Sequence, residues 1–195
     1  MDAETPALRQ LSAGLPDDAF LTDGLLTKRV LRAHALALLA PVGDECLWDL
    51  GAGTGSIGIE WCRLHPGNTA IAVERDPERA ARIGVNAARL EVQGRVQVRV
   101  GTVADVLPEL PVPAAIFIGG GVEAHTLTVC RDALAQGGRL VVHSVTAESD
   151  AVLLDAYRRW GGELSRIAVE TAEPIGRFTG FRPLRTVTTW AASRR

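Results

Sequence analysis

Cysteine is scarce in this sequence. The chain has three, Cys46, Cys62 and Cys130, and their separations match neither a disulfide framework nor the spacing of metal ligands. An odd, scattered set is typical of reduced thiols in a cytoplasmic protein. The cysteines therefore predict no metal site.

Long apolar runs and a targeting signal are also missing. No run approaches the ~20 residues of a membrane-spanning helix, and the first residues lack the basic and apolar regions of a secretion signal. Positive charge is not in excess, because 21 Lys and Arg stand against 23 Asp and Glu. That balance disfavours a nucleic-acid surface. We expect a soluble, cytoplasmic protein that binds neither membrane nor nucleic acid.

The length and composition fit a globular domain. The chain has 195 residues, of which 47% are hydrophobic, and this is enough to bury one substantial core. The first 13 residues are polar. We expect a flexible segment over residues 1–13 and a single domain over residues 14–195.

Apolar periodicity alternates between strand and helix patterns along most of the chain. Thr27 is expected to cap the first helix, and Asp76 to cap a helix that begins with Pro77. The expected strands are residues 45–50, 69–74, 95–100, 114–118, 139–144, 163–170 and 186–192; the expected helices are residues 27–40, 56–64, 77 onward, 103–107, 123–135 and 148–160.

This alternation predicts a parallel sheet with helices on both faces. The last two strands break the rule, since residues 171–182 have no helical pattern and suit a long hairpin loop. The final strand should therefore run antiparallel. A seven-stranded α/β sheet of this kind is typical of Rossmann-like methyltransferases, whereas a dehydrogenase domain would continue with parallel units.

The loop after the first strand is rich in glycine and fits two ligand patterns. Gly53, Gly55 and Gly58 match the dinucleotide fingerprint. Gly51, Gly53 and Gly55, with Thr54 between the last two, match the turn of methyl-donor enzymes. Both interpretations place the loop at a helix N-terminus.

Asp49 distinguishes these two ligands. It lies two residues before Gly51, where a carboxylate repels a pyrophosphate but attracts the α-ammonium group of S-adenosylmethionine (SAM). At ~4 Å and an effective dielectric near 20, the Coulomb energy is about 4 kcal/mol in either sign, before desolvation. Electrostatics therefore favours the methyl donor.

Further candidate cofactor residues follow the next two strands. Glu74 ends the second strand, where an acidic side chain accepts hydrogen bonds from ribose hydroxyls, and Arg75 follows it. Thr102 and Val103 follow the third strand, within reach of an adenine edge, although Val103 is as easily a core residue. Glu74 indicates a nucleoside without choosing between NAD and SAM.

With these residues in view, the sequence resembles a known family. Asp49-Leu-Gly-Ala-Gly-Thr-Gly55 with Val73-Glu-Arg-Asp-Pro77 is similar to class I SAM-dependent methyltransferases. Gly14-Leu-Pro-Asp-Asp-Ala-Phe20, Thr27-Lys-Arg29 and Ile118-Gly-Gly-Gly121 narrow the resemblance to the decarboxylating precorrin methyltransferases of cobalamin biosynthesis, the CbiT type and the C-terminal half of CobL.

The resemblance implies methylation of carbon-15 of precorrin-6B and loss of carbon dioxide from the ring C acetate, giving precorrin-7. Relatives of this kind are commonly tetrameric, so it also implies a homo-oligomer. Enzymes of the fused type carry an N-terminal domain that methylates carbon-5, and we expect this sequence to be either the other half of such an enzyme or a stand-alone subunit.

The substrate implied by this resemblance is a flat polyanion, which suggests candidate substrate residues. Gly119 is also a candidate cofactor residue, and bare backbone at Gly119, Gly120 and Gly121, the last two being the substrate candidates, allows a broad ring to approach closely. Cationic side chains recognise carboxylates, and His143, with His125 as its competitor, is placed to transfer a proton. The cationic candidates are Lys28, Arg29, Arg177 and Arg182, with Arg185 in the same loop as the last two.

Three alternatives remain open. A transfer-RNA adenine-N1 methyltransferase shares a closely similar fold but predicts a basic face. A nucleotide-binding oxidoreductase is disfavoured by Asp49 and by the closing hairpin. A non-catalytic partner subunit explains the lack of a certain acid or base, but not the intact glycine loop.

Overall fold

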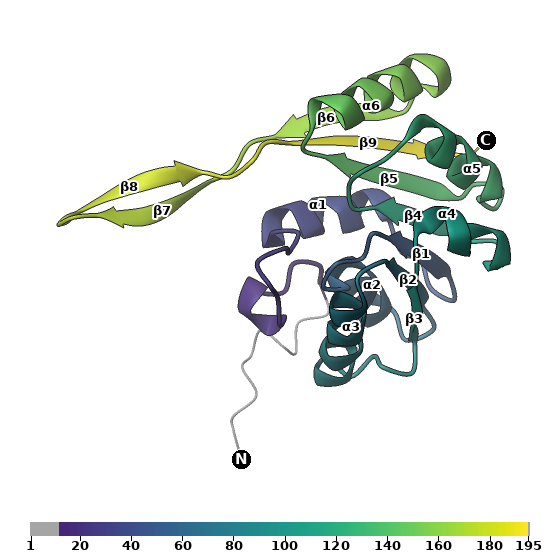
Figure 1. Ribbon diagram of the computed structural model, residues 1–195, viewed down its shortest axis with the longest axis horizontal. Helices are drawn as coiled ribbons and strands as arrows, with labels where there is room; N and C mark the ends of the chain where they lie inside the picture. The colour runs from purple at the N-terminus through teal and green to yellow at the C-terminus, as the bar shows by residue number, and fades with distance from the viewer. Residues whose placement is uncertain (1–11, 195) are drawn as a thin grey trace.

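The computed structural model describes residues 12–194; residues 1–11 and 195 lie outside the described part, including most of the segment expected to be flexible. The described chain is built on a seven-stranded sheet with the order β3-β2-β1-β4-β5-β9-β6 (Figure 1). Its strands are β1 (Cys46–Leu50), β2 (Thr69–Glu74), β3 (Val96–Val100), β4 (Ala115–Ile118), β5 (Arg139–Ser144), β6 (Glu163–Ile167) and β9 (Val187–Ser193).

Helices pack on both faces of the sheet, as the alternating pattern predicted (Figure 1). None of the helices in residues 12–194 has the length and apolar character that crossing a membrane requires. One face carries α1 (Arg29–Leu39), α2 (Ser56–Leu64) and α3 (Pro77–Arg89), and the other carries α4 (Val103–Val106), α5 (Ala124–Ala133) and α6 (Ala147–Trp160).

The core consists of two clusters, one on each face of the sheet. Successive residues of a strand point to opposite faces, so Leu47 of β1 packs with α1 and α2 while Trp48 packs with α5 and α6. The central strands are buried on both faces, which is why their sequences are almost continuously apolar.

The expected antiparallel last strand is confirmed. β9 lies between β5 and β6 and runs antiparallel to both, whereas the other neighbouring strands of this sheet are parallel. β6 is therefore held in the sheet through β9.

The expected long hairpin loop over residues 171–182 is itself made of paired strands. These residues form a second, two-stranded sheet, β7 (Glu170–Ile175) and β8 (Phe178–Pro183), which projects from the body of the molecule (Figure 1). The strands pair because a two-residue turn joins them, in which Gly176 has a φ of 58° that a glycine adopts without strain.

The start of the first helix also differs from the prediction. α1 begins at Arg29, and Thr27 does not cap it. The carboxylate of Asp17, twelve residues earlier, accepts the Arg29 N–H at 2.9 Å instead. Val30, in the first turn of α1, is exposed. The expected cap at Asp76 is confirmed, because its side chain accepts the first amides of α3.

A buried ion pair holds the N-terminal strap, which we define as residues 14–28. Arg32 and Glu60 are 0% and 2% exposed, and their side chains meet at 2.8 Å. Glu60 also accepts the Gly14 N–H at 2.6 Å, and Arg32 donates to Asp17 at 2.7 Å. Both buried charges are thus neutralised within the fold, and each fixes the strap.

The strap is also tied to α3. The amide side chain of the buried Asn86 accepts from the Leu21 N–H at 2.8 Å and donates to the carbonyls of Leu21 and Thr54, each at 3.0 Å. Asp23 accepts from Arg79 at 2.8 Å, and this hydrogen bond lowers the pKa of Asp23 to about 2. Asn86 therefore joins the strap directly to the glycine turn.

Replacing Glu60 with Gln should lower the free energy of unfolding by about 3–5 kcal/mol, because it leaves the buried Arg32 guanidinium without its carboxylate partner. The measurement is the midpoint of urea unfolding. Asp155→Asn is the matched control, since its ion pair with Arg159 is exposed and contributes less than about 1 kcal/mol. Equal midpoints for the two variants would contradict the assigned role of the buried pair.

Candidate cofactor and substrate cleft

The cleft lies at the carboxyl ends of β1 and β4, between which the sheet changes its winding direction. Open α/β sheets bind their ligands at such a position. It consists of two adjoining cavities, a large one of about 860 Å³ and a small one of about 490 Å³. The two share Gly51, Glu74, Arg79 and Gly119 in their linings.

The glycine turn requires its glycines for two physical reasons. Gly51, Gly53 and Gly55 have φ values of 71°, 59° and 73°, in the left-handed region that favours glycine. A Cβ on Gly55 would also lie 2.6 Å from the Ile83 side chain. Gly119 approaches from β4, where a Cβ would lie 2.9 Å from the Gly51 carbonyl oxygen. The two glycine segments pack backbone against backbone.

Asp49 lies beneath this turn and is 1% exposed. One of its carboxylate oxygens accepts the Gly58 N–H at 3.0 Å, and the residue lines the large cavity. Burial raises the pKa of Asp49 to about 7, the Gly58 hydrogen bond opposes this change, and the charge of Glu74 adds to it. A cationic group bound in the cavity would therefore lower the pKa of Asp49 and favour its ionised form.

Glu74 is held in one orientation by backbone amides. Its two oxygens accept from Gly53 at 2.9 Å and from Asp76 at 3.0 Å, and the side chain is 6% exposed. Each carboxylate oxygen can accept a second hydrogen bond. Because Glu74 lines both cavities, this remaining capacity is available where the two cavities meet.

The structure brings most of the predicted cofactor residues to the cleft. Thr54 lines the large cavity and is 2% exposed. Thr102 caps α4 by accepting the Asp105 N–H, and Val103 packs only partly into the core. The small cavity is lined by Arg75, Thr102 and Val103 together with Gly120 and Gly121.

The predicted cationic set divides into two groups. Lys28 and Arg182 line the large cavity with Arg185, and the first two also pair loosely with Asp17 and Glu173, each at 3.7 Å. Arg29 and Arg177 line neither of the two cavities in the described part of the chain, and a role for them in substrate binding stays a prediction. Arg29 is exposed at the start of α1, and Arg177 lies in the β7–β8 turn over the ring of Phe178.

The two candidate histidines also separate. His143 of β5 lines the large cavity, is 4% exposed and packs against the edge of Phe117 at 5.0 Å between ring centroids. Burial and, secondarily, the charge of His34 lower the pKa of His143 to about 4. His125 is exposed near the start of α5 and lines neither cavity, although its neighbours Glu123 and Thr126 line the small one.

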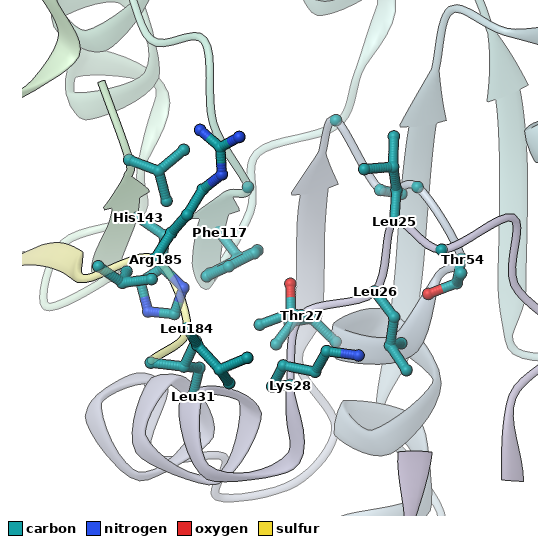
Figure 2. A pocket seen from close by; sticks show the side chains of 18 of the residues that line it. Leu25, Leu26, Thr27, Lys28, Leu31, Thr54, Phe117, His143, Leu184 and Arg185 are labelled. Atoms are coloured by element: carbon teal, nitrogen blue, oxygen red, sulfur yellow. The ribbon is translucent and has the colours of Figure 1, made fainter. Parts of the chain in front are cut away.

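Sequence reasoning missed the contribution of the strap. Figure 2 shows Leu25, Leu26 and Thr54 on one side of the large cavity, with Phe117 and Leu184 on the other. The available signal for Leu25 and Leu26 was that two adjacent apolar residues occur in a segment that is otherwise rich in turn residues. For Asn86, the signal was a polar residue on the apolar face of α3.

The sheet, its antiparallel β9 and the glycine turn define a class I SAM-dependent methyltransferase fold. A family model described as a precorrin methyltransferase domain matches residues 18–194, and the chain belongs to that family. The C-terminal domain of precorrin-6Y C5,15-methyltransferase from Rhodobacter capsulatus has a similar structure, with a TM-score of 0.90, 38% identity and coverage of 95% of this chain and 100% of that one.

Two curated relatives differ in length. Over 189 residues the chain is 46% identical to the decarboxylating precorrin-6Y C(5,15)-methyltransferase of Mycobacterium tuberculosis, covering 96% of this chain and 48% of the relative. It is 30% identical to a probable decarboxylating cobalt-precorrin-6B C(15)-methyltransferase of Pyrobaculum aerophilum, covering 89% and 92%. The chain thus spans about half the length of its precorrin-6Y relatives.

Asp49→Asn should remove a pH dependence of stability. The folded state keeps a proton on Asp49 that the unfolded chain loses above pH 3.8, so unfolding becomes easier as the pH rises from 3.8 to about 7. Relative to Asp49→Asn, the unchanged chain should lose up to about 4 kcal/mol across this range. Urea unfolding at several pH values measures the difference.

The pH dependence must be compared between variants, because His143 changes the free energy of unfolding with pH in the opposite direction to Asp49. Its lowered pKa contributes stability that is lost as the pH falls from 6.5 to about 4. Asp155→Asn, at an exposed carboxylate, is the control. Parallel pH curves for the unchanged chain and Asp49→Asn would show that Asp49 is not perturbed.

Proposed function

We propose that this chain transfers a methyl group from SAM to carbon-15 of precorrin-6B and removes carbon dioxide from the ring C acetate, giving precorrin-7 in cobalamin biosynthesis. The family assignment supports this substrate, as does a 30% identical relative named cobalt-precorrin-6B C(15)-methyltransferase (decarboxylating) from Salmonella typhimurium. The observation that carries the proposal is the buried Asp49 carboxylate beside an open glycine turn.

The cleft residues fit SAM at both ends. SAM supplies an electrophilic methyl group on a positively charged sulfur. Asp49, with Thr54 and the backbone of Gly51, Gly53 and Gly55, would hold its amino-acid end in the large cavity. Glu74 would accept from the ribose hydroxyls where the cavities meet. The adenine would occupy the small cavity against Arg75, Thr102 and Val103.

The methylation itself needs little from side chains. An electron-rich conjugated ring is already a carbon nucleophile, so placing it in line with the methyl group supplies most of what is required. Gly119, Gly120 and Gly121 let the ring come close because they present backbone alone. Leu25 and Leu26 on one side of the cavity and Phe117 on the other would offer apolar surface to the flat ring.

Carboxylates of the macrocycle would be recognised by Lys28, Arg182 and Arg185. All three line the large cavity, and within residues 12–194 no carboxylate pairs with Arg185. Its forked donors suit a carboxylate in a bidentate pair. Figure 2 shows Arg185 on the same side of the cavity as His143 and Phe117.

His143 is the proposed proton-transfer residue for decarboxylation. Loss of carbon dioxide leaves an electron pair that the conjugated ring delocalises, and the former acetate carbon must then gain a proton. Because its pKa is lowered to about 4, His143 is neutral near pH 7. It would therefore pass a proton between its two nitrogens rather than hold an extra one.

Larger assemblies stay proposals implied by the resemblance. These are a homo-oligomer, a fused or paired carbon-5 methyltransferase domain, and a cytoplasmic location. The β7–β8 hairpin suits a contact between copies of the chain, since Phe178 and Phe181 are 67% and 70% exposed. Sedimentation equilibrium of the native chain and of Phe178→Asp tests this contact. Identical molecular masses for the two proteins in solution would oppose it.

Membership of a methyltransferase family sets aside the oxidoreductase alternative. The likeness to the transfer-RNA (m1A58) methyltransferase of Aquifex aeolicus, at 16% identity and a TM-score of 0.70, concerns the fold alone. No observation on this chain favours that function over the proposed one.

S-adenosylhomocysteine should raise the melting temperature of the chain, and NAD should leave it unchanged. Asp49→Asn should weaken S-adenosylhomocysteine binding roughly tenfold or more, because the α-ammonium group of the ligand loses its negatively charged partner. For the unchanged chain, affinity should rise as the pH increases through about 7, where Asp49 ionises. Calorimetric titration measures these affinities, with Asp155→Asn as control. Stabilisation by NAD alone would refute the cofactor assignment.

Incubation with precorrin-6B and SAM should give a product that has gained one methylene unit and lost one carbon dioxide. Mass spectrometry distinguishes this product from one that is methylated only. Arg185→Lys should raise the KM for precorrin-6B more than it lowers kcat, because lysine keeps the charge but loses the fork. A chain that binds S-adenosylhomocysteine but leaves precorrin-6B unchanged would support the non-catalytic partner alternative.

A further inference from the structure

Beside the large cavity, the sheet carries a row of buried polar side chains. His143 of β5 is paired in register with Thr189 of β9, and Thr189 with Ser165 of β6. Residues directly opposite on neighbouring strands share a face, with Cβ atoms about 4.5–5.5 Å apart. The row therefore runs from the cavity lining at His143 to Ser165 on the edge strand.

The polar atoms of this row have no hydrogen-bond partner within residues 12–194. They are Nε2 of His143, Oγ1 of Thr189 and Oγ of Ser165, and Nε2 of His34 on α1 shares the same condition. His143 and Thr189 are 4% and 1% exposed. An unsatisfied buried polar group costs about 1–3 kcal/mol. Four such groups together are the usual surroundings of ordered internal water.

The elements around His143 supply few other polar groups. The helix α1, which packs against β5, contributes His34; β4 contributes the ring of Phe117; and β9 contributes Thr189. On the cavity side lie Arg185 and Glu173. The buried, unpartnered nitrogen of His143 thus lies on the same sheet face as the hydroxyls of Thr189 and Ser165, which lead in register to the edge strand.

We propose that Thr189 and Ser165, with internal water, deliver solvent protons to the buried nitrogen of His143, and that Thr189 is the positioning residue for the decarboxylation half of the reaction. This inference rests on the proposed function. The row ends at Ser165, a partly exposed residue of β6, which is the last strand of the sheet. A hydroxyl both accepts and donates, so it can pass a proton onward.

The proton transfer balances with water as the only co-reactant. The bond between the acetate methylene carbon and its carboxylate breaks, carbon dioxide leaves, and the electron pair stays on the methylene carbon, delocalised over the macrocycle. That carbon takes a proton from one nitrogen of His143, while the other nitrogen gains one through Thr189. The imidazole stays neutral, and exchange with solvent restores its tautomer.

Thr189→Val should uncouple the two reactions. Carbon dioxide release per S-adenosylhomocysteine formed should fall roughly tenfold, because proton delivery is impaired while methyl transfer is not. Thr189→Ser, which keeps the hydroxyl, should retain the native ratio. Thr188→Val is the matched control, since Thr188 is also buried with an unpartnered hydroxyl but points to the opposite face.

A native ratio in Thr189→Val, or equal losses of both activities, would overturn the proton path. Absence of methyl transfer in the native chain would instead refute the proposed function. Nuclear magnetic resonance of the native chain gives a second, activity-independent test. His143 ring protons should show cross-relaxation with long-lived internal water, and the loss of this signal in Thr189→Val but not in Thr188→Val is expected. A native His143 without such a signal would also overturn the proposal.

Discussion

The cleft depends on a pair of opposite charges, Arg32 and Glu60, that the fold has removed from water. Each charge alone would be costly in the core, so each makes its partner necessary. Their remaining hydrogen-bonding groups contact the strap: Glu60 accepts the Gly14 N–H, and Arg32 donates to the Asp17 carboxylate. The strap in turn supplies Leu25 and Leu26 to the cavity. A core electrostatic constraint thus determines the shape of a ligand wall.

Burial has opposite effects on the two titratable groups of the cleft. It raises the pKa of Asp49 to about 7 and lowers that of His143 to about 4, because in both cases the low-dielectric surroundings disfavour the charged form. The first group is thereby poised to respond to a cation. The second stays neutral, which suits transfer of a proton but not storage of one.

Patterns within single elements predicted much of the fold. The strands 69–74 and 139–144 and the helix 56–64 have the expected bounds, because apolar periodicity and adjacent turn residues act locally. Asp49, Glu74 and the glycine turn were recognisable for the same reason. What the sequence did not reveal depends on distant contacts: the Asp17 cap on Arg29, the Asn86 bridge and the outward position of Arg177.

The position of β9 has a consequence for the order in which the molecule is assembled. β6 emerges from the ribosome before β9, which is its only neighbour in the main sheet among residues 12–194, so β6 stays unpaired while the β7–β8 hairpin is synthesised. Residues 182–185, which line the large cavity just before β9, take their places at the same late stage. Non-local pairing of this kind is slow. Ligand-binding competence is therefore acquired at the close of folding, together with the sheet itself.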